Sequence, residues 1–228
     1  MPDLARRAGA EAIGVFALVF AGCGAIVANA EHPGSLGTVG IALVFGLVVM
    51  AMIYATGHLS GAHLNPAVTL AFLVTRHFPR REAAAYLVAQ LAGALAAAAL
   101  LATIWPGDPA ALGTTQPSVG TGSAFAYEAV LSAFLMFVIM AVATDARAVG
   151  AAAAIAIGAT VGLDALFGGP VTGASMNPAR SLGPALVSGV TADLWLYLAA
   201  PVAGTVLGAL AYQLVRGEHP AARQAGGA

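Results

Sequence analysis

Two Asn-Pro-Ala tripeptides, at residues 65–67 and 177–179, are the most informative short motifs in this sequence. Asparagine is favoured at the cap before a helix, and proline fits the first helical position because its missing N–H would have no partner there. Each tripeptide therefore predicts the start of a helix, and the apolar stretches that follow, 67–74 and 179–187, are about half a membrane span in length. The two motifs consist of Asn65, Pro66 and Ala67 and of Asn177, Pro178 and Ala179.

Two such helix starts facing each other would make a selective constriction without any covalent chemistry. Each helix N-terminus carries roughly +0.5 of an elementary charge, so the pair repels cations, including hydronium, and attracts neutral molecules that have lone pairs. With each asparagine oxygen acting as a cap, the amide NH₂ is expected to donate into the lumen. A water molecule held by Asn65 and Asn177 would then be turned so that a proton-conducting chain of waters is interrupted.

Arg180, Glu11 and Glu128 are charged residues that stand in otherwise apolar stretches. Arg180 falls in the first turn of the second half-helix, where a guanidinium lining a narrow neck excludes cations and donates hydrogen bonds to a neutral solute. Glu11 and Glu128 occupy corresponding places in the two halves, although a charge at the centre of a bilayer costs about 2.5–3.5 kcal/mol or more. A proton relay, as in an ion-coupled carrier, is one interpretation of such a pair.

The amino-acid composition indicates the environment of these residues. Of 228 residues, 60% are hydrophobic and 8% charged, with a mean hydropathy of +0.88, whereas a soluble domain has roughly 25% charged residues. A soluble enzyme, a nucleic-acid binder and a disordered chain are therefore excluded, and an integral membrane protein is indicated. Six spans of sufficient length are expected at about 10–30, 37–57, 83–104, 124–143, 149–168 and 194–215.

The basic residues predict the orientation. The chain has no lysine, and eight of its nine arginines fall at the termini or in the second and fourth loops, with Arg180 as the exception. The positive-inside rule then places both termini in the cytoplasm, here of a plasma (inner) membrane. A cleaved N-terminal signal is the competing interpretation, but Glu11 interrupts its apolar run. The single Cys23 excludes a disulfide within the chain, and a small buried thiol is expected.

The two halves of the chain resemble each other. Residues 60–67 align with 172–179, and the single domain 1–228 divides into repeats at about 8–104 and 124–215. Because each repeat has three spans, the second must cross the membrane in the opposite sense. The two half-helices then enter from opposite faces, as re-entrant segments that meet near the midplane.

At this point the sequence resembles the aquaporin (major intrinsic protein) family over about residues 8–215. The resemblance is carried by residues 57–69 and 176–181, and residues 169–185 look most like plant nodulin-like intrinsic proteins and their bacterial relatives. It implies an all-α membrane fold of six spans and two half-helices, a passive channel without cofactor or metal, and a homotetramer. It assigns Glu11 and Glu128 to holding the half-helix loops. It also implies an outer selectivity filter made of Phe45, Ala165, Ala174 and Arg180.

The filter departs from the pattern of strict water channels, which usually have histidine at the position of Ala165 and a small polar residue or cysteine near Ala174. Two alanines make a wider, less polar opening, which favours glycerol, urea and undissociated boric, silicic or arsenous acid besides water. Ser181, however, resembles the choice of water channels or nodulin-like proteins, so a strict water channel remains an alternative. His63 is a candidate for the lumen. Asp164 is expected to bind a loop backbone or to pair with Arg180.

An ion-coupled carrier is the main rival from another class, because it would use the same inverted repeats and intramembrane glutamates. An intramembrane enzyme lacks the usual motifs: the sequence has no Gly-x-Ser-x-Gly, no His-Glu-x-x-His and no paired aspartates in its spans. The expected partners are therefore water, small neutral solutes and the lipid bilayer, with no nucleic acid.

Overall fold

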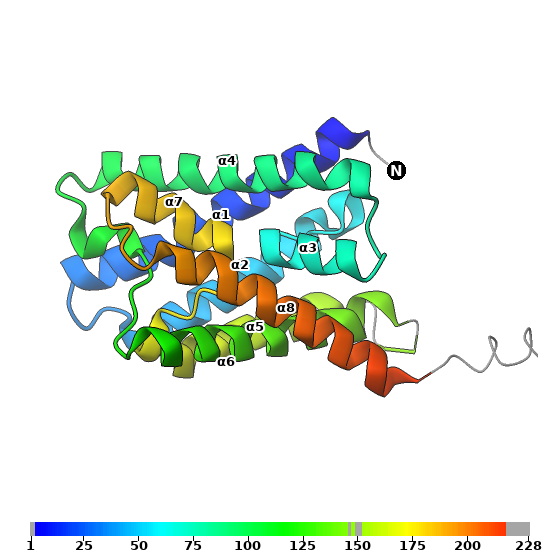
Figure 1. Ribbon diagram of the computed structural model, residues 1–228. Helices are drawn as coiled ribbons and strands as arrows, with labels where there is room; N and C mark the ends of the chain where they lie inside the picture. The colour runs from blue at the N-terminus through cyan, green and yellow to red at the C-terminus, as the bar shows by residue number, and fades with distance from the viewer. Residues whose placement is uncertain (1–2, 146, 149–151, 218–228) are drawn as a thin grey trace, which may run out of the picture.

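The computed structural model describes residues 3–145, 147–148 and 152–217. Within these ranges the chain forms α-helices and one short 3₁₀ helix, η1 (Figure 1). In chain order they are α1 Leu4–Glu31, α2 Gly37–Ser60, α3 Pro66–Val74, α4 Arg80–Ile104, η1 Pro109–Gly113, α5 Thr121–Thr144, α6 Ala153–Thr172, α7 Pro178–Ser188 and α8 Leu194–Arg216.

Six of these helices, α1, α2, α4, α5, α6 and α8, are long and apolar enough to cross a membrane. The short helices α3 and α7 are the half-helices expected after the two tripeptides, and the order long, long, short, long occurs twice. In Figure 1, α3 occupies one half of the length of the bundle and α7 the other. The all-α fold with six spans and two half-helices is therefore confirmed.

The first span starts earlier than its apolar residues indicate. The helix α1 begins at Leu4 rather than near residue 10, because Asp3 caps it: its carboxylate accepts a hydrogen bond from the N–H of Arg6 at 2.9 Å. A helix begins where a capping group can satisfy its first free N–H groups, and this point need not coincide with the start of the apolar segment. The helix therefore extends beyond the apolar segment to include Arg6 and Arg7.

The fifth span ends later than expected. A Gly-Pro pair is a common end signal, but α6 continues through Pro170 to Thr172. It ends at Gly173, whose φ of 85° is left-handed and whose N–H donates to the Gly169 carbonyl, the usual use of glycine at a helix end. Residues 149–151, at the beginning of the expected span 149–168, lie outside the described residues.

Glycines allow the long helices to approach backbone to backbone, as small residues do in membrane proteins. A Cβ added at Gly46 of α2 would lie 2.7 Å from the carbonyl oxygen of Gly158 in α6. Glycines of α4 and α8 pack in the same way, because their added Cβ atoms would collide with carbonyls of α1 or α5; these are Gly93, Gly204 and Gly208. The close packing holds the long helices around the half-helices.

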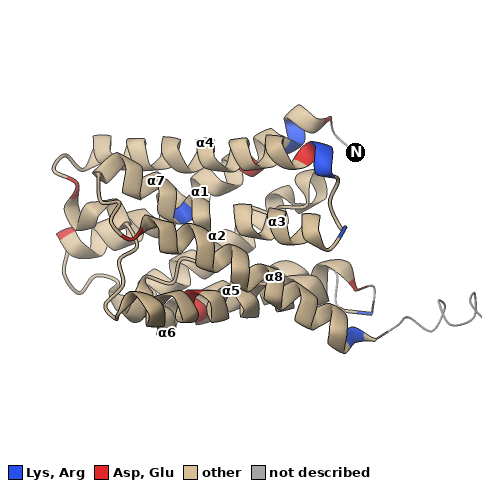
Figure 2. Cartoon of the chain, in the orientation of Figure 1, with Lys and Arg blue, Asp and Glu red and all other residues tan. Residues whose placement is uncertain are grey.

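The arginines of the described chain gather at one end of the bundle, the end where the N-terminus lies (Figure 2). The helix α7 carries the exception in the middle of the bundle, and its only basic residue is Arg180. The loops at the opposite end, 32–36 and 105–120, contain no arginine. Arg223, one of the eight arginines used for orientation, lies outside the described residues.

Candidate functional site

The two half-helices meet at their N-termini, as their capping residues predict. The Asn65 side chain accepts from the N–H of Ala67 at 2.8 Å, and Asn177 accepts from the N–H of Ala179 at 3.0 Å. Pro66 and Pro178 stand at the first helical positions. Both N-termini are buried inside the bundle and line the same cavity.

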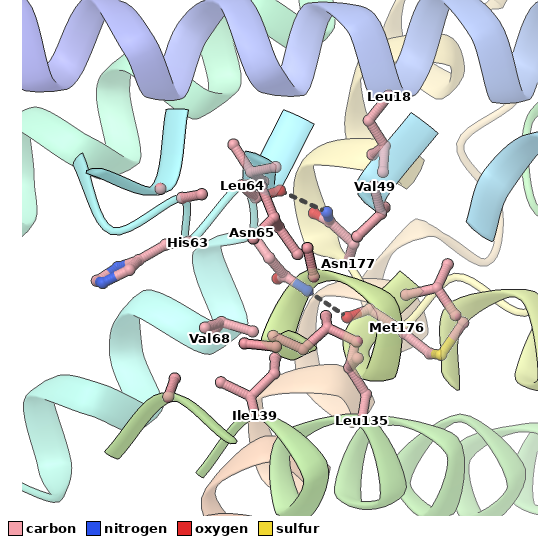
Figure 3. A pocket seen from close by; sticks show the side chains of 18 of the residues that line it. Leu18, Val49, His63, Leu64, Asn65, Val68, Leu135, Ile139, Met176 and Asn177 are labelled. Atoms are coloured by element: carbon pink, nitrogen blue, oxygen red, sulfur yellow. Dashed lines mark hydrogen bonds between the residues drawn. The ribbon is translucent and has the colours of Figure 1, made fainter. Parts of the chain in front are cut away.

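Each asparagine amide also reaches across to the other loop. Asn65 Nδ2 donates to the Met176 carbonyl at 2.7 Å, and Asn177 Nδ2 donates to the Leu64 carbonyl at 2.8 Å (Figure 3). The sequence argument expected both amide hydrogens to face the lumen. The structure differs because one hydrogen of each amide bonds the opposite loop, which leaves one per asparagine for a solute.

The chain before each tripeptide is held in a strained conformation. Gly61 and Gly173 have φ of 88° and 85°, which glycine adopts freely. Three residues lie between each glycine and its asparagine, and the first and third of them also have positive φ although they are not glycine: 46° at Ala62, 52° at Leu64, 41° at Ala174 and 52° at Met176. Such residues persist only where the surroundings hold them in place.

Glu11 supplies that hold in the first repeat. Its Oε1 accepts from Ser60 Oγ at 2.7 Å and from the N–H of His63 at 2.9 Å. Its Oε2 accepts from the N–H of Leu64 at 2.7 Å and from Gln90 Nε2 at 2.8 Å. The fully buried carboxylate is therefore surrounded by four donors, which offset the cost of its burial.

Glu128 does the same in the second repeat, with one donor fewer. It accepts from Thr172 Oγ1 at 2.6 Å, from the N–H of Ser175 at 2.9 Å and from the N–H of Met176 at 2.9 Å. The position that aligns with Gln90 is Pro201, which has no side-chain donor. In both repeats the glutamate accepts from two backbone N–H groups of the loop. Only the first repeat adds a side-chain donor from the following long helix, Gln90.

Two tyrosines that the sequence argument did not assign as supports complete the loops. Tyr86 donates to the Ser60 carbonyl at 2.7 Å, and Tyr197 donates to the Thr172 carbonyl at 2.6 Å. Both are fully buried. The repeat alignment pairs Tyr86 with Tyr197, so this symmetry was a signal from which their shared role could have been inferred.

Arg180 lies in the first turn of α7 and is 1% exposed. Its Nη1 donates to the Gly113 carbonyl at 2.7 Å, and its guanidinium carbon lies 5.0 Å from the centre of the Phe45 ring. Its Nε is buried without a hydrogen-bond partner in the described part of the chain. An arginine held on one side, with an unused donor on its side chain, is suited to bind a neutral molecule that accepts hydrogen bonds.

The sequence argument missed the element that holds Arg180 in place. The turn η1 lies in the loop between α4 and α5, and Gly113 at its end packs against α1. Thr115 follows it, is buried and donates to Ser181 Oγ at 2.7 Å. This arrangement depends on contacts far apart in the sequence, and no motif in residues 105–120 indicated it.

A cavity of about 570 Å³ extends from this filter toward the end of the bundle where the arginines gather. All four expected filter residues line it, and so do Asn65 and Asn177. Most of its wall is apolar (Figure 3), with side chains such as Leu18, Val49, Val68, Leu135 and Ile139. The expected site residues, distant in sequence, are therefore brought together around one space.

His63 also lines the cavity. Its Nδ1 lies 3.1 Å from Thr69 Oγ1, and its ring packs against those of Phe72, Phe78 and Tyr86, with centroids 4.7–5.2 Å apart. The ring is thus part of an aromatic cluster that fixes one edge of the lumen.

Two further residues have simpler outcomes. Asp164 makes neither of the expected bonds: its Oδ2 is buried without a hydrogen-bond partner among the described residues, while Arg180 donates to Gly113 instead. The structure offers no physical account of its carboxylate. Cys23 is a fully buried free thiol, as expected, with Sγ 3.9 Å from the Gly113 carbonyl.

Comparison with known proteins gives concordant results. The sequence pattern of the major intrinsic protein family matches residues 1–212. Nodulin-26 of Glycine max is 50% identical over 207 residues, covering 91% of this chain and 76% of that protein. Aquaporin NIP1-3 of Oryza sativa subsp. japonica is 48% identical over 214 residues, covering 94% and 75%. Among solved structures, the aquaglyceroporin from Plasmodium falciparum superposes with a TM-score of 0.82 at 29% identity, covering 94% of this chain and 97% of that one.

Proposed function

The chain belongs to the major intrinsic protein family, and we infer that it is a passive transmembrane channel for water and small uncharged solutes rather than an enzyme. One observation carries this inference: two half-helix N-termini meet inside a six-span bundle and line the same apolar cavity. A polar constriction of this kind offers hydrogen bonds to a passing molecule at one depth in the membrane. It selects which molecules pass and neither makes nor breaks covalent bonds.

Charge is the first basis of selection. The two helix N-termini contribute roughly half a positive charge each, and the Arg180 guanidinium adds a full charge at the outer filter. Cations, including protons carried by water, are therefore repelled. The second amide hydrogens of Asn65 and Asn177 bind the oxygen of a neutral molecule. They turn that molecule so that the chain of hydrogen bonds between successive molecules in the pore is interrupted.

Size is the second basis. At the filter, Ala165 and Ala174 have no side chain beyond Cβ, so Phe45 and Arg180 alone narrow the opening. We propose that glycerol, urea and undissociated boric, silicic or arsenous acid pass along with water. The likeness to a structure described as an aquaglyceroporin supports this proposal.

Liposomes that contain the purified protein test the solute range. Stopped-flow light scattering would compare water, glycerol, urea and boric acid against empty liposomes. We expect faster flux than in empty liposomes for all four. Faster flux for water alone would favour the strict water channel, and flux equal to that of empty liposomes for every solute would contradict the channel function.

The roles of the supporting residues are also part of the proposal. Glu11 and Glu128 hold the two loops by accepting their N–H groups, so that Asn65 and Asn177 stay aligned. His63 contributes one edge of the lumen. The hydrogen-bond lengths of 2.6–2.9 Å to both glutamates support a structural role over a proton relay, because both oxygens of each carboxylate already accept hydrogen bonds from supporting donors.

For the assembly, we propose a homotetramer with one pore per subunit in a plasma membrane, with both termini in the cytoplasm and repeats at about 8–104 and 124–215 of a single domain. The gathering of arginines at one end supports the orientation. An apolar groove of about 430 Å³ between the outer faces of α2 and α6 supplies contact surface for a neighbouring copy. Chemical cross-linking in membranes would test the tetramer.

A further inference from the structure

One face of α1 packs against side chains that line the pore, and it carries two glycines. Gly14, Leu18 and Gly22 are spaced by four residues, which places them on one side of the helix. Leu18 lines the cavity. A Cβ added at Gly14 would collide with Leu64 Cδ2, and one added at Gly22 would collide with the Phe45 ring. Each glycine therefore leaves a slot in α1 that a pore-lining side chain fills.

The slot at Gly22 is the one that bears on selection. An added Cβ would stand 2.6 Å from Phe45 Cδ1 and 2.5 Å from Cζ, closer than side-chain carbons approach in proteins, and nearer still to Cε1. The Phe45 ring thus lies directly against the backbone of α1. Its position against that backbone is available only because residue 22 has no side chain.

The opposite constraint on the ring comes from the filter. Phe45 lines the cavity, and the Arg180 guanidinium carbon lies 5.0 Å from its centroid. The ring cannot move into the backbone of α1, so a side chain at residue 22 would displace it toward the cavity. There it would approach Arg180, which lines the same cavity.

We propose that Gly22 is a specificity-determining positioning residue, which sets the bore of the filter through Phe45. It touches no solute itself. The inference rests on the proposed channel function and adds to it the residue that sets the distance between the Phe45 ring and Arg180. With glycine at residue 22 the filter admits solutes of the size of glycerol. With a larger residue the opening becomes narrower and favours water over glycerol.

The test compares the ratio of glycerol to water permeability in liposomes for the unmodified protein, Gly22→Ala, Phe45→Ala and the double variant. Gly22→Ala should lower the ratio about tenfold, since one methyl-sized change in a fitted pocket is worth roughly 10–200-fold. In the Phe45→Ala background the same substitution should leave the ratio unchanged, because the colliding atoms are gone. Gly24→Ala is the matched control: its Cβ would meet only Leu101 Cδ2, at 3.4 Å.

An unchanged ratio in Gly22→Ala, or an equal fall with and without the Phe45 ring, overturns the inference and leaves the channel function standing. A failure of the unmodified protein to conduct either molecule overturns both. If Gly22→Ala does not reach liposomes, Phe45→Leu with and without Gly22→Ala replaces it. The shorter leucine still occupies the slot, so the ratio should fall in the same direction by a smaller factor, and no fall overturns the inference.

Discussion

Arg180 is a full positive charge that is 1% exposed in the middle of an apolar bundle. Its Nη1 bond to Gly113 and its contact with Phe45 hold the guanidinium in place. Burying a charge costs free energy unless the charge is paired and hydrogen-bonded, so a role in selection would account for a guanidinium at this position. At the scale of single residues, the proposed filter consists of a positively charged donor, two alanines and one aromatic ring, all of which line one cavity. The predictions at this scale concern which solutes pass.

Replacing Arg180 with alanine should let cations and larger solutes through. A unit charge about 4 Å from a passing ion contributes roughly 1–4 kcal/mol between the dielectric of water and that near a protein surface, so we expect proton leak to rise about tenfold or more. A pH-sensitive dye inside liposomes measures it. Arg81→Ala, at the exposed start of α4, is the control, and equal leak in the two variants would count against the filter role.

Introducing histidine at Ala165 should restore the narrower opening of a strict water channel. We expect glycerol flux to fall about tenfold and water flux to fall less, since the imidazole fills space and also offers a hydrogen bond. Ala143→His, at a residue that lines the same cavity but is not one of the four proposed filter residues, is the control. A parallel fall of glycerol and water flux in Ala165→His would show that bore does not set the selection.

The elements next to the filter depend on two buried carboxylates rather than on packing alone. The segments 61–64 and 173–176 contain four non-glycine residues with positive φ, a conformation that costs on the order of 1–3 kcal/mol per residue. The bonds to Glu11 and Glu128 stabilise it. The next prediction follows from the fact that a carboxylate accepts at both oxygens and an amide at only one.

Glu11→Gln should destabilise the protein and reduce flux. Its amide nitrogen would face two donors that Oε2 now accepts, from Leu64 and Gln90, and two unpaired buried donors cost about 2–6 kcal/mol together. Thermal unfolding in detergent and water flux in liposomes would both report it. Glu31→Gln, at the exposed end of the same helix, should change neither, and an equally stable Glu11→Gln would remove the support role.

Outside the membrane-spanning segments, Asp145 ties the end of α5 to α8. It accepts from Arg147 Nη2 at 2.6 Å and from Tyr212 Oη at 2.8 Å, and Arg147 Nη2 also donates to the Arg216 carbonyl at 3.2 Å. The hydrogen bonds from Arg147 hold the pKa of the Asp145 carboxyl well below its ordinary value of 3.8. A pKa lowered by folding stabilises the protein above that ordinary value, and the stabilisation is lost as pH falls toward the lowered pKa.

The unfolding temperature of Asp145→Asn should therefore lie below that of the unmodified protein at pH 7. The difference between the two unfolding temperatures should shrink as pH falls below about 4, because the stabilisation by the ionised Asp145 carboxylate is lost there. Thermal unfolding measured from pH 7 to pH 3 checks the trend. Asp193→Asn, whose side chain caps no helix, should show no such convergence, and a gap that widened in acid would reverse the sign of the argument.

At the scale of elements, the sequence could predict those features that depend on residues close together in the chain. Apolar length indicated the six spans, and Asn-Pro at the cap indicated where α3 and α7 begin. The turn η1 and the Gly113 carbonyl that binds Arg180 could not be predicted, because that contact joins residues 67 positions apart. The repeat alignment could also have indicated Tyr86 and Tyr197, and it placed Pro201 where the first repeat has Gln90.

At the scale of the whole molecule, the separation of charge decides the kind of transport. Apart from Arg180, the arginines of the described chain lie at one end of the bundle (Figure 2), and the two half-helices meet at the constriction in its middle (Figure 1). An ion-coupled carrier needs a site that binds the coupling ion. Both buried glutamates instead have their oxygens engaged by loop donors, which favours a pore that needs no second ion.

Glycerol uptake into liposomes, measured with and without an imposed sodium or proton gradient, tests this claim most directly. A passive channel predicts a rate that rises in proportion to the glycerol gradient, with low activation energy and no response to either ion gradient. Uptake that saturates with glycerol concentration and accelerates with a sodium or proton gradient would contradict the channel and identify a carrier.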